Sequence, residues 1–141
     1  MSTKWTPSLA VGVPAIDEQH QELFARVGRL IEAMKASDPA EVGRLMDFLG
    51  EYVVEHFRME EGLMQRYGYP DFQLHKAAHD RFIQDYGELR HKFDIKGAKS
   101  FVTLQAKSWL GDWLVAHVSG TDMSLARWLQ RAVRAQQARA G

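Results

Sequence analysis

The chain contains no cysteine among its 141 residues, and this absence removes several chemistries at once. Without thiols there is no disulfide framework, thiol nucleophile, thiolate zinc site or iron–sulfur cluster. An excess of charge of one sign is also missing, since Lys and Arg number 18 and Asp and Glu number 18. The chain therefore has no overall positive charge to attract the phosphate backbone of a nucleic acid, and a general nucleic-acid partner is not expected.

Long uninterrupted apolar runs are absent as well. The N-terminal stretch lacks the apolar core of a signal peptide, and no later segment approaches the length of a membrane span. Because 45% of the residues are hydrophobic, a chain of this length can bury one sizeable core. We therefore expect a single domain over residues 1–141, in a soluble, cytoplasmic protein with no integral membrane segment.

The sequence does contain strong helical periodicity, in which apolar residues recur at spacings of three and four. Four such stripes follow one another along the chain, and turn signals separate them. Asp38 and Pro39 suit the cap and first position of a helix, Gly68 suits the end of one, and Gly97 lies in a turn. Four helices joined by short connections favour antiparallel neighbours.

The predicted fold is therefore all-α, an antiparallel up-down-up-down four-helix bundle with an N-terminal arm and a short C-terminal helix. The arm should occupy residues 1–15 and the bundle about residues 16–118. A break at residues 119–121 should separate the bundle from the C-terminal helix, which we place at about residues 121–138. No internal repeat or linker divides the chain further.

Five of the six histidines interrupt the apolar stripes, where apolar residues belong. Residues four apart on a helix are neighbours, roughly 5–6 Å between Cβ atoms, so such pairs can hold one small object together. A single core histidine is more often a neutral ring bonded to backbone. Burying the whole set without strong partners would cost several kcal/mol or more, which favours a metal site. The polar residues on the core stripes are His20, His56, Glu60, His75, His79 and His117.

Two further residues need separate treatment. His91 lies about 120° around the helix from the stripe of His79, so we assign it to the solvated face. Asp122 follows His117 by five residues, and a regular helix would direct it about 140° away. A kink at Gly120 or a π-bulge would bring Asp122 onto the same face as His117, and the alternative is a simple cap of the C-terminal helix.

The combined pattern resembles the hemerythrin family, and most closely its single-domain bacterial members. The matching stretches are WTP at residues 5–7, VGVPAIDEQH at 11–20, HFRMEEGLM at 56–64, YGYP at 67–70, HKAAH at 75–79 and WLVAH at 113–117, followed by Asp122. They span residues 5–122. The resemblance implies two non-haem iron ions in a four-helix bundle, bridged by one Glu, one Asp and one oxo or hydroxo oxygen.

Carried over by motif, the resemblance also implies a role for each ligand. His75, His79 and His117 would hold the first iron, His20 and His56 the second, and Glu60 and Asp122 would bridge them. Counting ligands on two six-coordinate irons then leaves one open position, on the iron that has only two histidines. Dioxygen should bind there, and an apolar pocket should surround it. The candidate pocket residues are Phe57, Trp113, Leu114 and Val118, and a plain core role fits Leu114 equally well.

We expect this chain to bind dioxygen reversibly, for carriage, storage or delivery, and not to act as an enzyme. Di-iron oxidases of the ferritin-like type use Glu-x-x-His motifs, and no Glu lies three residues before a core histidine here. The rivals are a di-iron oxidase or peroxidase, an oxygen or redox sensor that docks a partner, and a metal-stabilised bundle that holds zinc. An oxygen-consuming enzyme, or weak contact of the Arg-rich C-terminal helix with a membrane surface, is a further partner expectation.

Overall fold

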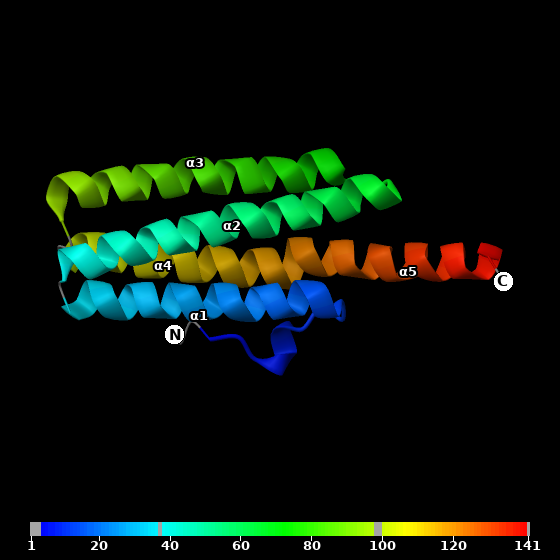
Figure 1. Ribbon diagram of the computed structural model, residues 1–141, viewed down its shortest axis with the longest axis horizontal. Helices are drawn as coiled ribbons and strands as arrows, with labels where there is room; N and C mark the ends of the chain where they lie inside the picture. The colour runs from blue at the N-terminus through cyan, green and yellow to red at the C-terminus, as the bar shows by residue number, and fades with distance from the viewer. Residues whose placement is uncertain (1–3, 37, 98–99, 141) are drawn as a thin grey trace.

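The computed structural model describes residues 4–36, 38–97 and 100–140, and these ranges contain helices and no strand. The long helices are α1 (Pro14–Ala36), α2 (Pro39–Tyr67), α3 (Phe72–Lys96), α4 (Ser100–Ala116) and α5 (Met123–Ala140). Helices α1 to α4 lie side by side along the long axis of the molecule (Figure 1). Short connections make successive helices antiparallel, which confirms the predicted four-helix bundle. No described helix combines the length and hydrophobicity needed to span a bilayer.

The ends of α2 show why the chain turns where it does. Asp38 precedes the helix, and its carboxylate accepts a hydrogen bond of 3.3 Å from the backbone N–H of Glu41, while Pro39 occupies the first turn. At the other end Gly68 adopts the left-handed conformation, with φ of 70°. Glycine takes this conformation without a Cβ clash, so the helix ends there and α3 can run back.

The fourth helix does not break where the sequence predicted a break. Helix α4 passes into a π-helical segment, η2 (His117–Asp122), and then directly into α5. The N–H of Met123 reaches the carbonyl of Val118, five residues back, which is the π pattern. Helix α5 lies within two residues of the C-terminal helix predicted at about residues 121–138, but it is not separated from the bundle, because the π turn keeps the backbone bonded through residues 119–121.

The N-terminal arm packs against the start of α1. Its backbone contains one 3₁₀ turn, η1 (Pro7–Leu9), and α1 begins at Pro14, so the predicted arm boundary at residue 15 was slightly late. Both carboxylate oxygens of Asp17 accept backbone hydrogen bonds, from Val11 at 2.7 Å and Gly12 at 3.1 Å. Gln130 donates to the carbonyl of Gly12 from α5. Residues 1–3 of the predicted arm lie outside the described residues.

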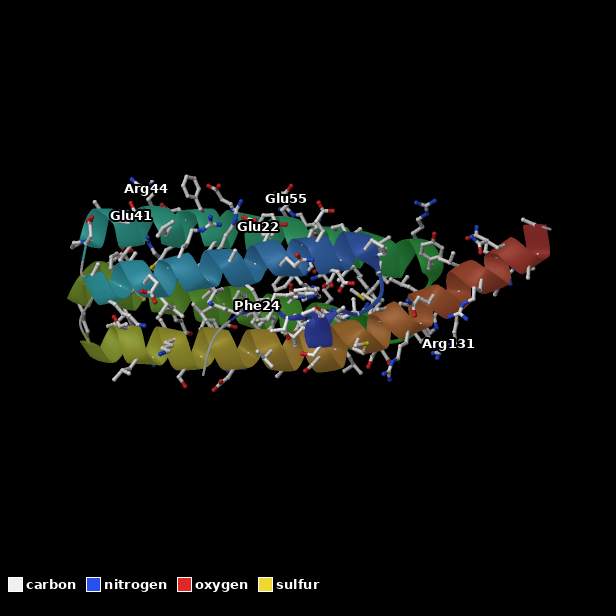
Figure 2. The ribbon with its side chains drawn as sticks, turned by 90° about the horizontal axis from the view of Figure 1, so that it is seen from below. Glu22, Phe24, Glu41, Arg44, Glu55 and Arg131 are labelled. Atoms are coloured by element: carbon white, nitrogen blue, oxygen red, sulfur yellow. The ribbon has the colours of Figure 1, made fainter. Side chains whose placement is uncertain are left out.

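The core runs the length of the bundle, and its composition changes along that length. Apolar residues such as Leu30 and Met46 fill one end, and the candidate ligands occupy the other. The spacing of three and four in the sequence puts Leu45 and Leu63 on the same stripe of α2 as His56 and Glu60, a prediction that was correct at the middle of the helix but not toward its ends. There Met46 and Met64 are buried, whereas Leu45 and Leu63 are only half-buried. Helix α5 projects beyond the ends of α1 and α3, and Arg131 lies on this projecting part (Figures 1 and 2).

Candidate metal centre

All seven sequence-predicted ligands lie together in the core, on four different elements. His20 comes from α1, His56 and Glu60 from α2, His75 and His79 from α3, and His117 and Asp122 from η2. Each has an exposed fraction of 6% or less. His91, which the sequence placed on the solvated face, is exposed.

Local helix geometry explains how each element contributes its side chains. The spacing of four within His56/Glu60 and within His75/His79 places both members of each pair on one face of a regular α-helix. In η2 the spacing of five works because a π turn brings residues five apart onto the same side. The alternative in which Asp122 only caps α5 does not hold, since Asp122 is fully buried and lies 3.1 Å from the Nε2 of His117.

The histidines form two groups around the two carboxylates. One group contains Glu60, His75, His79, His117 and Asp122, and the other contains His20, His56, Glu60 and Asp122. Within each group the ligand atoms lie within 4.8 Å of one another. Glu60 and Asp122 belong to both groups, so each carboxylate lies between the three-histidine side and the two-histidine side.

The oxygens of each carboxylate are divided between these two sides. On the three-histidine side, Oδ1 of Asp122 lies 3.0 Å from the Nε2 of His75, and Oε1 of Glu60 lies 3.1 Å from the Nε2 of His79. On the two-histidine side, Oδ2 of Asp122 lies 2.8 Å from the Nε2 of His20, and Oε2 of Glu60 lies 3.5 Å from the Nε2 of His56. Each carboxylate thus presents one oxygen to each side.

These close approaches are not hydrogen bonds. Both oxygens of Glu60 and of Asp122, and the Nε2 atoms of four of the five histidines, are buried without a hydrogen-bond partner in the described protein. Buried polar atoms are normally bonded, and leaving so many unsatisfied would be very costly. Lone pairs that converge in this way are satisfied by cations, and imidazole with carboxylate suits iron among the divalent metals. The residues therefore fit a metal centre.

Two residues that the sequence analysis missed support the ligand rings from behind. The side-chain oxygen of Gln19 lies 2.7 Å from the Nδ1 of His56, and a carboxylate oxygen of Glu61 lies 2.9 Å from the Nδ1 of His79. If each Nδ1 carries the proton and donates it, the Nε2 lone pair of that ring is free to bind a metal. Both residues are direct sequence neighbours of ligands, which is the one signal that could have indicated them.

The protein groups also set each other's protonation. Burial lowers the pKa of His56 to about 3 and that of His79 to about 2, so both rings are held neutral. Burial, with the charge of Asp122, raises the pKa of Glu60 to about 8. Burial opposes ionisation of Asp122 too, but the imidazoles of His117, His20 and His75 hold its pKa well below the usual range. Burial opposes protonation of His75, but its contacts with Asp122 and Glu60 raise its pKa to about 9, so a cation that binds here displaces a proton from this cluster of imidazoles and carboxylates.

Aromatic rings cover the three-histidine side. Phe57 stacks on His79 with ring centroids 3.8 Å apart, and Trp113 stacks on His117 at 4.4 Å. Beside them lies a cavity of about 20 Å³ whose lining, in the described residues, is entirely aliphatic or aromatic and includes Phe57, Trp113 and Leu114. Val118, the fourth predicted pocket residue, is fully buried but does not line this cavity. Such a lining offers water no partners, so the cavity should be dry.

Comparison with known proteins gives the family. A family model described as "Hemerythrin HHE cation binding domain" matches residues 11–129. The chain belongs to the hemerythrin family. The bacteriohemerythrin of Methylococcus capsulatus is 35% identical over 119 residues, covering 84% of this chain and 89% of that protein. The bacteriohemerythrin of Stenotrophomonas maltophilia is 32% identical over 122 residues, covering 86% and 78%.

Solved hemerythrin structures share the fold. The crystal structure of a wild-type hemerythrin superposes with a TM-score of 0.81 at 33% identity, covering 89% of this chain and 96% of that chain. A hemerythrin variant in which a leucine is replaced by tyrosine gives a TM-score of 0.82 at 32% identity, covering 92% and 98%. Hemerythrin membership and the cluster of imidazoles and carboxylates together support a non-haem iron protein that binds oxygen.

Proposed function

We propose that this hemerythrin binds dioxygen reversibly at a pair of non-haem irons, for oxygen carriage, storage or delivery. The observation that carries the proposal is the division of the carboxylate oxygens. Glu60 and Asp122 each direct one oxygen toward the three-histidine side and one toward the two-histidine side. Carboxylates placed between two sets of imidazoles are suited to bridge two cations, and a lone cation would leave one set unused.

The two sides are not equivalent, and this difference supports a binding role. His75, His79 and His117 would hold one iron, and His20 and His56 the other. Bound at these residues, two ferrous ions would supply the two electrons that reduce dioxygen reversibly to the peroxide level. The two-histidine side has one protein nitrogen fewer, so the protein leaves room for a small ligand there. Gln19 and Glu61 fix ring orientation, and the aromatic rings keep water away from the ligands.

Metal analysis and oxygen cycling test this proposal together. We expect about two irons per chain, and a reduced, colourless protein that colours under oxygen and bleaches again under vacuum for many cycles. A chain that binds only a single metal ion would contradict the paired site. Irreversible oxidation after a single exposure would contradict carriage.

We also propose that the chain is not an enzyme. Support comes from the cavity beside the ligands, whose described lining contains no acid, base or hydroxyl group to deliver protons to bound oxygen. The test is oxygen consumption by the iron-loaded protein with excess ascorbate as reductant. A binding protein takes up about one dioxygen per site and stops, whereas sustained consumption would indicate an oxidase or peroxidase.

A cytoplasmic location and a docking partner remain predictions. Helix α5 contains four arginines and no acidic residue, and residues 130–140 extend beyond the part that matches the family. Its charge would favour contact with an acidic membrane surface or an acidic oxygen-consuming enzyme. Replacing Arg131, Arg134 and Arg139 by Gln should then weaken association with anionic vesicles or with such an enzyme, and leave oxygen affinity unchanged.

A further inference from the structure

The dry cavity borders both sides of the ligand cluster, because Leu23 and Val53, which lie three residues from His20 and His56 on their helices, line it together with Phe57 and Trp113. Phe57 and Trp113 line the cavity, and the same two rings stack on His79 and His117. The cavity holds about one water-sized molecule, and its lining favours an apolar occupant. A neutral diatomic gas therefore fits this space better than water or an anion.

A second hollow lies on the outside of α4. It is a shallow groove of about 550 Å³ lined by Gln105, Ser108, Trp109, Asp112 and Trp113. Trp113 is the one residue of this groove that also lines the inner cavity. Its indole is half-buried, so one part faces the groove while another part faces the core.

We propose that Trp113 is the gate through which dioxygen passes between the outer groove of α4 and the apolar cavity beside the ligand cluster. The inference rests on the proposed function, because it assigns the route for the ligand of that same site. Beyond reversible binding, dioxygen then has a defined access path, and Trp113 controls entry to that path.

The surroundings of Trp113 explain why this residue can move when its neighbours cannot. Leu114 has an exposed fraction of 6% and Phe82 of 4%, so both are confined by the core. Trp113 packs on Phe82 at 4.3 Å and on His117 at 4.4 Å between ring centroids, but its remaining side borders the groove. Rotation toward the groove would carry the indole away from these rings and into solvent-exposed space, where side chains change rotamer readily.

The rim of the groove also selects for neutral molecules. Asp112 is exposed at the mouth, next to Trp113 in the sequence, and its charge disfavours anions that would compete for the metals. Dioxygen is neutral and apolar, so the carboxylate does not hinder it. The same route would therefore admit nitric oxide as well.

The kinetic test compares two tryptophans one helical turn apart. Association is followed by mixing the reduced, iron-loaded protein with dioxygen, and dissociation by mixing the oxygenated protein with dithionite. Because a gate lies on the path in both directions, Trp113→Ala should raise both the association and the dissociation rate constant by about tenfold. Trp109→Ala is the matched control, since Trp109 lines the groove but not the cavity, and both rates should stay at the wild-type values.

A conservative variant separates gating from the stacking on His117. Trp113→Phe keeps an aromatic ring in that place but blocks less of the opening, so both rates should rise by a smaller, equal factor. A change in only one rate constant would mean that Trp113 contacts the bound ligand, and it would overturn the gate. Unchanged rates in Trp113→Ala would overturn it too.

Two measurements keep the gate distinct from reversible oxygen binding. Nitric oxide association with the ferrous protein needs no release step, and Trp113→Ala should accelerate it by about the same tenfold factor even if oxygen binding proves irreversible. Xenon-pressurised crystals of the oxidised, iron-loaded protein should show a xenon atom in the cavity. A cavity without xenon would overturn the route, whatever the protein does with oxygen.

Discussion

The two ends of the bundle core are built by the same four helices and bury opposite kinds of side chain. At the end where α1 finishes and α2 begins, Leu30, Met34 and Met46 are all at least 99% buried in apolar surroundings. At the other end the same helices bury five imidazoles and two carboxylates. At the apolar end, burial of each such side chain stabilises the fold by roughly 1.5–3 kcal/mol. The polar end has desolvation costs that only its bound cations can offset.

The apolar end therefore contributes to stability alone, whereas the ligand end contributes to function and, through its metal, to stability as well. The apolar end can hold the helices together without help, and the ligand end takes its final order from the metal. Substitutions at the apolar end should therefore change the free energy of unfolding and leave the iron content unaltered. Substitutions at the ligand end should change both.

Removal of the metal should have the largest effect. A ligand that binds only the folded state at about 1,000 times its dissociation constant stabilises by about 4 kcal/mol, which corresponds to a rise in melting temperature of about 10–20 °C. Dialysis against a chelator should lower the melting temperature, measured by circular dichroism, by at least about 10 °C, and ferrous iron should restore it. An unchanged midpoint would show that the polar end is stable by itself.

At the apolar end, Leu30→Ala should lower the free energy of unfolding by about 2–5 kcal/mol, because it leaves a cavity in a packed core. Denaturant unfolding measures the loss, and iron content by elemental analysis should remain that of the wild type. Leu104→Ala, at a leucine that is 67% exposed, is the matched control and should cost less than about 0.5 kcal/mol. Iron loss in Leu30→Ala would mean that the two ends are coupled.

Behind the ligands, Glu61→Ala removes the acceptor for the Nδ1–H of His79. Loss of such a partner typically lowers metal affinity 10–100-fold, or about 1.4–2.7 kcal/mol. Competition with a chelator of known affinity measures the change. Glu55→Ala is the control, since Glu55 is an exposed glutamate of the same helix (Figure 2), and its iron affinity should match the wild type. Equal affinity in both variants would remove Glu61 from the site.

The smallest effect is expected at a helix cap. Asp38 accepts a hydrogen bond at the start of α2, so Asp38→Ala should cost about 1 kcal/mol without loss of iron. Asp71 occupies the corresponding position before α3 but its side chain makes no cap hydrogen bond, so Asp71→Ala should cost clearly less. Thermal melts of the two variants, measured side by side, would show similar losses of stability if the Asp38 hydrogen bond contributed nothing.

Much of the fold and the ligand placement follows from the sequence because helical spacing is a local property. His56 with Glu60 and His75 with His79 share a face wherever the chain is helical, so their positions could be predicted. The partners of the Nδ1 atoms could not be, because Gln19 reaches His56 across two helices, and that contact depends on how α1 and α2 pack.

The remaining errors have the same origin in packing. In α2, a helix of 29 residues, the buried face drifts around the axis as neighbours change, so Met46 and Met64 are buried where the stripe indicated Leu45 and Leu63. At residues 119–121 the glycine and hydroxyl residues indicated a break. Whether such a stretch breaks the helix or forms a π turn is decided by the burial of Asp122, which sequence spacing does not reveal.

The π turn of η2 adds one residue to the continuous helix formed by α4, η2 and α5. In a regular helix His117 and Leu125, eight residues apart, would differ by about 80° around the axis, and seven residues would bring them to within about 20°. Both residues are buried on the side that faces the bundle. The continuous helix formed by α4, η2 and α5 therefore contains one residue more than a regular α-helix would need to bury both. The extra residue behaves as an insertion. Deletion of Gly120 should restore a regular α-helix in which Leu125 and Leu129 still face the bundle core. Asp122 would then follow His117 at the spacing of about one regular helical turn.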